Sequence, residues 1–280
     1  MKKLVILTLL LIITGATWFF TQKQTDEAGN KADLENLVLT GSSTVAPLAA
    51  EIGKRFEALH GNVRVNVQTG GSSRGINDVR SGLADIGMAS RALKDDESGL
   101  FSFTIATDGI GMIVNRANPV AALSRQQIID IYTGKITDWQ TVGGSAAPIT
   151  VVNKAEGHST LELFLQHFGL QNSDVKAHVI IGDNQQGIKT VAGNPNAIGY
   201  VSIGSAEYEA QHDAAIKLLP LDGIAASVEN VQNGTFPLAR PLNLVTRSEP
   251  TGISKAFIEF ARSGQVDDLV TAQYFVPVAH

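Results

Sequence analysis

The sequence predicts an α/β protein with two lobes, and two observations lead to that prediction. From residue 37 onward, short β-branched runs alternate with amphipathic helical patterns, which is the element order of a parallel α/β sheet. Three loops rich in Ser, Thr and Gly each stand just before a helical pattern, at residues 41–44, 70–73 and 157–160. The first two loops belong to one α/β set and the third to another, so a ligand that contacts all three would lie between two lobes.

The first α/β set begins with a strand at residues 38–40. Apolar residues such as Leu48, Ile52 and Phe56 then recur at helical spacing, which predicts a helix over 45–59. The set continues with a strand at 63–68, a helix at 75–81 and a short strand at 85–88.

The second α/β set follows an extended apolar run at residues 110–115. Ser124 stands directly before a helical pattern at 125–132, and we expect it to cap that helix because a hydroxyl accepts from the first free backbone N–H groups. The remaining expected elements are strands at 149–153, 179–181, 198–202 and 237–246 and helices at 161–168, 185–192 and 253–263.

Composition and charge exclude several classes of protein. The chain has no cysteine, so it forms no disulfide, no thiolate metal site and no lipid anchor on a cysteine. Its formal net charge is -5 and it has no basic run beyond the first three residues, which excludes an electrostatic footprint for nucleic acid. The histidines are scattered and show no H-E-x-x-H spacing, so we expect neither a bound metal nor another cofactor.

Residues 1–20 have the pattern of an export segment. Two lysines precede an apolar run from Leu4 to Phe20, and a polar stretch follows. The segment is either a signal peptide, with a weak small-x-small cleavage pattern at 14–16, or an uncleaved signal anchor near the lower length limit for a membrane span. Residues 21–36 would then be a flexible linker. We therefore expect the protein in the periplasm, either free or tethered to the inner membrane.

The three loops can form a receptor for a small oxyanion. A loop of this kind presents backbone N–H groups and hydroxyl donors at the positive end of a helix. The residues that offer such donors are Ser43, Thr44, Ser72, Ser73, Ser159 and Thr160. Because the net charge of the chain is negative, an anion would have to be held by these local donors.

Six motifs follow one another through the chain after residue 37. They are GSSTVAP from Gly41, GSSRG from Gly71, ADIGMASR from Ala84, DGI from Asp108, IYTGKITDW from Ile131 and NPNAIGYVS from Asn194. With these motifs the chain resembles the phosphate-specific substrate-binding proteins of bacterial ABC transporters, which are Pst-type periplasmic binding proteins.

The resemblance implies a type II periplasmic-binding-protein fold and a monomer. Each lobe would be a mixed sheet flanked by helices, and two segments would cross between the lobes. Lobe one would comprise residues 37–115 and 237–280, and lobe two residues 116–236. The crossings would fall near Asn115 and within residues 219–237.

The resemblance also implies that the protein binds inorganic phosphate between the lobes and presents it to a membrane permease, so it would not be an enzyme. The phosphate contacts of the family correspond to Thr44, Val45, Ser72, Ser90, Ser159 and Thr160, each of which offers a hydroxyl or an N–H at the start of a helix. Ser43, Ser73, Lys154 and His158 stand beside them and complete the candidate set.

The third loop and Ser90 depart from the family pattern. Lys154 stands where many relatives have an arginine, and a lysine lacks the bidentate fork that suits two phosphate oxygens; His158 replaces a small serine. Ser90 stands where some relatives have an aspartate, which accepts the proton of hydrogen phosphate and thereby excludes sulfate. Glu156 or Asp108 could supply an acceptor instead, which leaves the selectivity between phosphate and sulfate open.

Two other functions fit parts of the sequence. The run Gly71-Ser72-Ser73-Arg74-Gly75 matches the G-x-S-x-G nucleophile elbow, which predicts an esterase with Ser73 as nucleophile and Asp183 and His212 as its partners. An uncleaved anchor would fit a membrane-tethered protein that senses or scavenges phosphate. Ester hydrolysis that is lost in Ser73→Ala would favour the first function, and the mass of the mature N-terminus tests the second.

Overall fold

A computed structural model describes residues 34–280, of which residues 36–280 form one unit. The export segment expected at residues 1–20, and the linker expected at 21–36 except for its end, lie outside the described residues. None of the helices found in residues 34–280 combines the length and the apolar character that are needed to span a bilayer.

Strands and helices alternate along most of the unit. The strands are β1 (Glu35–Gly41), β2 (Val63–Thr69), β3 (Ile86–Ala89), β4 (Phe101–Asn115), β5 (Thr150–Lys154), β6 (Val179–Ile181), β7 (Ala197–Ser202), β8 (Ile216–Leu219), β9 (Ala239–Thr246) and β10 (Val276–Pro277). The α-helices are α2 (Ala46–Leu59), α3 (Ser72–Ser81), α4 (Arg125–Tyr132), α5 (Ser159–Phe168), α6 (Asn184–Ala192), α7 (Ile203–Gln211), α8 (Val228–Gln232), α9 (Gly252–Ala261) and α10 (Asp267–Ala272).

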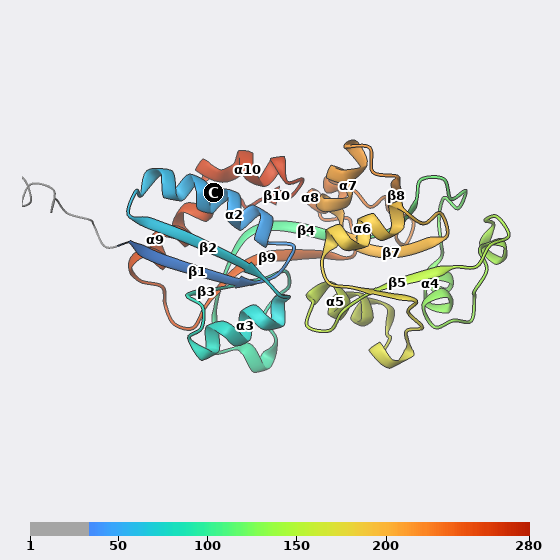
Figure 1. The fold of residues 1–280 in the computed structure, drawn as a ribbon, viewed down its shortest axis with the longest axis horizontal. Coiled ribbons are helices and arrows are strands. Elements are labelled where there is room, and N and C mark those ends of the chain that lie inside the picture. The colour runs from blue at the N-terminus through green and yellow to red at the C-terminus, as the bar shows by residue number, and fades with distance from the viewer. Residues whose placement is uncertain (1–33) are drawn as a thin grey trace, which may run out of the picture. The chain divides into compact units, whose positions relative to one another are not determined.

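The strands form one hydrogen-bonded path in the order β2-β1-β3-β9-β4-β7-β5-β6, and β8 and β10 each pair with β4 (Figure 1). The pairs β1–β3 and β5–β7 are parallel. In contrast, β9 runs antiparallel to both β3 and β4. The strands are therefore mixed in direction and flanked by helices, which confirms the fold class that the resemblance implied.

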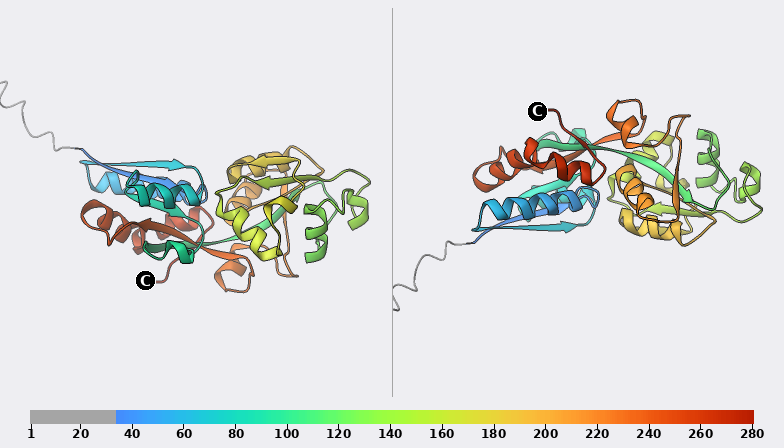
Figure 2. Two further views of the ribbon diagram at one scale, coloured as in Figure 1. Left: turned by 90° about the horizontal axis from the view of Figure 1, so that it is seen from below. Right: turned by 90° about the horizontal axis from the view of Figure 1, so that it is seen from above.

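The long strand β4 joins two groups of elements, which we call lobe one and lobe two. Residues 101–109 pair with β9, whereas residues 110–114 pair with β7. Lobe one comprises β1, β2, β3, β9, β10, α2, α3, α9 and α10, and lobe two comprises β5 to β8 and α4 to α8. Figure 2 shows both groups from two further directions, with β4 and β9 running between them. The first crossing between the lobes lies between Gly109 and Ile110, where the pairing partner of β4 changes from β9 to β7. The second crossing lies after Leu238, which belongs to the core of lobe two and directly precedes β9.

Each lobe has its own apolar core. In lobe one, α2 buries Ile52 and Phe56, and the Phe56 ring meets that of Phe257 of α9 edge to face. In lobe two, the ring of Phe164 of α5 stacks on that of Tyr200 of β7, with 4.0 Å between the ring centroids. A buried aromatic pair contributes about 0.5–1.5 kcal/mol beyond its area. These contacts fix α2 and α5, and hence the loops at their starts.

The loops before α3 and α5 touch each other through their backbones. Gly71 and Gly157 both have a positive φ, of 89° and 82°, which glycine adopts without strain. A Cβ on Gly71 would lie 2.5 Å from the carbonyl oxygen of Gly157. Glycine is therefore required at residue 71 both for the turn and for the approach of lobe two.

Candidate functional site

Four serine hydroxyls meet at the boundary between the lobes. Ser42 donates to Ser90 (3.0 Å), Ser72 donates to Ser159 (3.0 Å), and the hydroxyls of Ser90 and Ser159 lie 2.6 Å apart. Ser42, Ser72 and Ser90 follow β1, β2 and β3 of lobe one, whereas Ser159 begins α5 of lobe two. We call these four residues the hydroxyl cluster.

A small, closed cavity lies within the hydroxyl cluster, and its lining side chains approach one another so closely that no space the size of a water molecule is left. Its lining residues are Ser42, Ser43, Thr44, Gly71, Ser72, Ser90, His158, Ser159 and Thr160. The lining therefore consists of hydroxyls, one imidazole and the backbone at the starts of α2, α3 and α5, with no carboxylate. Donors at helix N-termini favour a bound anion.

Arg240 of β9 lies directly behind the cavity and bonds to hydroxyls of both lobes. Its Nη1 donates to Ser90 (3.3 Å) and to Thr160 of lobe two (2.9 Å), and its Nη2 donates to Thr44 (3.2 Å). Nε and Nη2 also donate to Oδ2 of Asp108, at 3.1 and 2.8 Å. All five guanidinium N–H donors are thus engaged, and the ion pair is almost completely buried, with each side chain 1% exposed.

The arginine determines what its hydroxyl partners can do. A Ser or Thr hydroxyl has one O–H donor and two lone pairs. Because a lone pair of Thr44, Ser90 or Thr160 faces Arg240, the proton of each hydroxyl is directed away from the arginine, toward a neighbouring hydroxyl or a ligand in the cavity. Asp108 balances the charge of the arginine, so the site offers polarised donors rather than a free cation.

A family model described as the PBP superfamily domain matches residues 26–265 of this chain. The chain belongs to the PBP superfamily. The phosphate-binding protein PstS of Bacillus subtilis is 27% identical over 248 residues, which cover 87% of this chain and 81% of that protein.

Two solved structures support the same membership. A protein of Clostridium perfringens, classed as a phosphate ABC transporter substrate-binding protein and solved with bound phosphate, is 34% identical, has a TM-score of 0.81, and covers 88% of this chain and 100% of its own. An ABC-type phosphate transport receptor of Vibrio cholerae is 30% identical, has a TM-score of 0.72, and covers 87% of this chain and 100% of its own. These PBP relatives are named as binding proteins or receptors, and they confirm the resemblance that the sequence motifs carried.

Lys154, at the end of β5 of the PBP domain, lies buried beside the hydroxyl cluster. Its Nζ donates to Oδ1 of Asn184 (3.1 Å), and Nδ2 of Asn184 donates to the hydroxyl of Thr44 (3.1 Å). Burial, reinforced by the charge of Arg240 and opposed by Asp183, lowers the pKa of Lys154 to about 7. A bound anion would favour the charged form of this lysine.

Val45 and His158 lie at the starts of α2 and α5. Val45 is fully buried, and its N–H and that of Thr44 donate to the hydroxyl of Ser42, at 3.3 and 3.2 Å. His158 is half-buried and lines the small cavity. Burial, followed by the charge of Lys154, lowers the pKa of His158, so its imidazole is neutral at neutral pH and offers one N–H donor.

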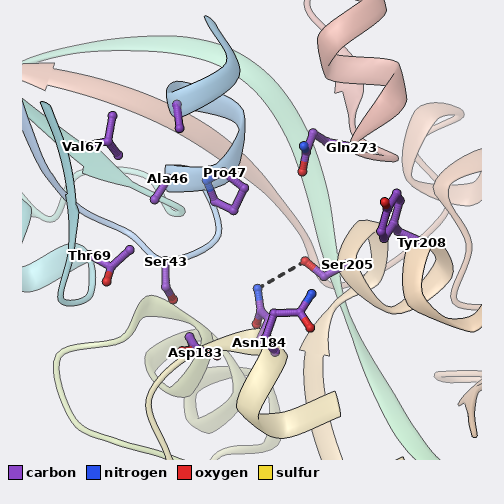
Figure 3. Close-up of a pocket in the computed structure, with 12 residues that line it drawn as sticks. Ser43, Ala46, Pro47, Val67, Thr69, Asp183, Asn184, Ser205, Tyr208 and Gln273 are labelled. Atoms are coloured by element: carbon purple, nitrogen blue, oxygen red, sulfur yellow. Dashed lines mark hydrogen bonds between the residues drawn. The ribbon is translucent and has the colours of Figure 1, made fainter. Parts of the chain in front are cut away.

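Ser43 lines the small cavity and also a larger one of about 480 Å³ beside it. Figure 3 shows the larger cavity, with Pro47 and Val67 of lobe one on one side and Asn184 and Tyr208 of lobe two on the other. This larger cavity is the part of the cleft between the lobes that adjoins the hydroxyl cluster.

Ser73 is a candidate residue that the structure does not bring into the hydroxyl cluster. Its hydroxyl donates to Oε1 of Glu162 (3.1 Å), and its N–H donates to the carbonyl of Gly157 (3.1 Å). Both of its donors are used in contacts with lobe two. Ser73 therefore joins the lobes beside the cavity and does not line it.

The three residues expected for an esterase have separate partners in the structure. The hydroxyl of Ser73 is bonded to Glu162, Asp183 accepts from the N–H of Gln186 at the start of α6 (2.7 Å), and the ring of His212 stacks on Tyr208. The described residues thus assemble no triad around Ser73. Among residues 34–280, no group of histidines and carboxylates has the arrangement of a metal site.

Neither carboxylate considered as an acceptor for the phosphate proton is available to the cavity. Oδ1 of Asp108 accepts from the hydroxyl of Ser202 (3.0 Å) and from a backbone N–H (3.2 Å), and its Oδ2 accepts twice from Arg240. Glu156 is exposed and accepts from Asn172 (2.8 Å). The expectation that one of them replaces the aspartate of some relatives is therefore corrected, since the lone pairs of Asp108 are occupied and Glu156 faces solvent.

Sequence reasoning missed Arg240, Ser42 and Asn184 as parts of this site. Ser42 stood within the first motif, but nothing in the loop distinguished its hydroxyl from that of Ser43. Arg240 is 196 residues from Thr44 in the chain. The available signal was a single arginine inside an otherwise apolar late strand, since a charged residue in a buried strand is rare unless it is paired.

Proposed function

We propose that this chain binds inorganic phosphate in the hydroxyl cluster and delivers it to the permease of an ABC transporter. The observation that carries the proposal is the position of Arg240, which bonds to hydroxyls of both lobes around one small, donor-lined cavity. The relatives named as phosphate-binding proteins, and the Clostridium perfringens structure with bound phosphate, favour phosphate over other oxyanions.

Binding works by closure of the lobes and makes no covalent bond. From lobe one, Thr44 and Ser90 donate to the anion through their hydroxyls and Ser72 through its backbone N–H at the start of α3, because the hydroxyl proton of Ser72 is used on Ser159. Ser159 and Thr160 donate from lobe two. Because the anion reaches both sets of donors only when the lobes are together, it stabilises the closed form. Burying a multiply charged anion is costly unless its lone pairs find donors, and the cluster supplies them. The permease then recognises the closed protein.

The place of action is outside the cytoplasm, in the periplasm, which the lysine-first apolar segment at residues 1–20 supports. We assign residues 37–109 and 239–280 to lobe one and residues 110–238 to lobe two, with the crossings in β4 and before β9. The mass of the mature N-terminus distinguishes a free form from a form tethered by an uncleaved segment.

Calorimetric titration with phosphate and with sulfate tests the proposal. Thr44→Val keeps the shape of the side chain but removes a hydroxyl that accepts from Arg240 and Asn184, so phosphate affinity should fall by about 1–3 kcal/mol. Thr104→Val is the matched control, because Thr104 in β4 bonds to Asn243 outside the site, and it should bind phosphate like the wild type. Absence of phosphate binding, or equal affinities of the two variants, would refute the proposal.

A further inference from the structure

Glu162 lies in the first turn of α5 of lobe two, yet the polar groups that its carboxylate meets within residues 34–280 belong to lobe one. Its Oε2 lies 3.0 Å from Nε of Arg91 and 2.9 Å from Nζ of Lys94, and its Oε1 accepts from the hydroxyl of Ser73 at 3.1 Å. Arg91 and Lys94 follow β3, and Ser73 lies at the start of α3. One carboxylate therefore joins lobe two to two segments of lobe one.

Arg91 is held on lobe one independently of Glu162. Its side chain is 4% exposed and donates to both carboxylate oxygens of Glu97, at 2.7 and 2.8 Å. Its carbonyl accepts from Asn243 of β9 at 2.8 Å. The Nε of Arg91 is left to face Glu162, where it is not aligned for a hydrogen bond, so the two groups attract each other through their charges. Lobe one thus presents a fixed cation to the carboxylate of lobe two.

The charge of Glu162 is maintained and balanced where it lies. Burial opposes its ionisation, but the ammonium group of Lys94 and the guanidinium of Arg91 close to its carboxylate lower the pKa of Glu162. Arg91, Lys94, Glu97 and Glu162 together carry two positive and two negative charges. This group therefore adds no net negative charge that would repel an anion nearby.

The contacts of Glu162 lie directly beside the hydroxyl cluster without entering it. Glu162 is one helical turn after Ser159, and its partner Ser73 is the neighbour of Ser72. The hydroxyls of Ser72 and Ser159 are themselves bonded across the lobes at 3.0 Å. Glu162 is not among the residues that line the small cavity. Its ion pairs hold together the starts of α3 and α5, which supply two donors of the site.

We propose that Glu162 is a positioning residue that holds the two lobes together and thereby sets the affinity of the site for its anion without touching the anion. The identity of the anion rests on the proposed function, but the contact between the lobes does not. The anion enters between open lobes and is retained when they close, so the measured affinity scales with the fraction of molecules that close. Loss of the Glu162 contacts reduces that fraction.

Glu162→Gln tests the proposal against Glu156→Gln, which removes the same charge from an exposed residue of lobe two that bonds to Asn172 of the same lobe. Phosphate affinity should fall about tenfold in Glu162→Gln and stay unchanged in Glu156→Gln. In stopped-flow experiments the loss should come from faster dissociation with an unchanged association rate, because the opening of the lobes limits release. The difference from the wild type should shrink in high salt, which screens a partly exposed ion pair.

Small-angle scattering of the anion-free proteins provides a readout that does not depend on phosphate. Glu162→Gln should have a larger radius of gyration than both the wild type and Glu156→Gln. Equal radii and equal affinities in the two variants would overturn the proposal. A wild-type protein that fails to bind phosphate would refute the proposed function, while the scattering comparison would still decide the role of Glu162. If Glu162→Gln fails to fold, Lys94→Met serves in its place, because it removes the half-exposed partner of Glu162. A radius of gyration and a phosphate affinity equal to those of the wild type in Lys94→Met would equally overturn the proposal.

Discussion

Replacing Gly71 by alanine tests whether the loops of the two lobes must touch for the anion to be held. A Cβ at residue 71 would lie 2.5 Å from the carbonyl oxygen of Gly157 in lobe two, whereas an ordinary contact needs about 3.5 Å. Lobe two would have to move away by about 1 Å, the difference between these distances. Such a displacement lengthens the bond from Ser72 to Ser159, now 3.0 Å, and the bond from the N–H of Ser73 to Gly157, now 3.1 Å, beyond hydrogen-bond range.

The size of the effect follows from these lost bonds. Each contributes about 1 kcal/mol, so closure of Gly71→Ala should cost about 2 kcal/mol more than closure of the wild type. Since about 1.4 kcal/mol corresponds to a tenfold change, phosphate affinity should fall by about 30-fold. Alanine at a positive φ also costs about 1–2 kcal/mol, but this strain acts within lobe one in both the open and the closed form and leaves the affinity unchanged.

Calorimetry and thermal denaturation separate the two effects, with Gly143→Ala as the control. Gly143 has a φ of 85°, and a Cβ there would meet no atom within 4 Å. Both variants should therefore melt at a lower temperature than the wild type, and only Gly71→Ala should bind phosphate more weakly. Equal phosphate affinity in the two variants would show that the approach of Gly71 to Gly157 has no part in binding.

Three further predictions concern the charged groups and the anion. Arg240→Met leaves the buried carboxylate of Asp108 without its partner, so the free energy of unfolding in denaturant titrations should fall by about 3–5 kcal/mol and phosphate binding should be lost. The control Arg55→Met removes an exposed ion pair with Asp268 of α10 and should change neither quantity. A similar loss in both variants would contradict the role given to Arg240. Between pH 8 and 10, wild-type phosphate affinity should fall by up to tenfold per pH unit, because anion-free Lys154 has a pKa of about 7 and must take up a proton when the anion binds. The phosphate affinity of Lys154→Arg should not change over this pH range. Parallel pH profiles of the two proteins would disprove the coupling. Phosphate at 100 times its dissociation constant should raise the free energy of unfolding by about 2.7 kcal/mol, and an unchanged melting temperature would mean that the folded protein does not bind it.

Local sequence signals located most of the helices and strands. Ser124 caps α4 as expected, by accepting from the N–H of Gln127, because a cap depends only on residues three positions apart. The extended apolar run at 110–115 is the last part of a strand that begins at Phe101. The first part of this strand pairs with β9 and passes from exposed at Phe101 to buried at Ile105 without an alternating pattern, so its burial is set by tertiary neighbours.

The short elements between residues 203 and 219 were not expected from the sequence. The structure places α7 and β8 there, but each is brief and α7 has a weakly amphipathic pattern. Such segments obtain their stability from packing on neighbouring elements rather than from their own propensity. Their existence therefore depended on β4, which pairs with β8.

The sequence by itself determined the alternating elements, the three donor loops and the family, because caps, helical periodicity and glycine turns depend on near neighbours in the chain. Only the tertiary structure decided which loop hydroxyls face the cavity. Because the side chains of adjacent residues at the start of a helix point about 100° apart, Ser72 joins the hydroxyl cluster while Ser73 bonds to Glu162. The tertiary structure also brought together Arg240 and Asp108, which are 132 residues apart. A buried charge can be recognised as part of a site only when the fold shows which groups surround it, because burial and partners arise from contacts between distant parts of the chain.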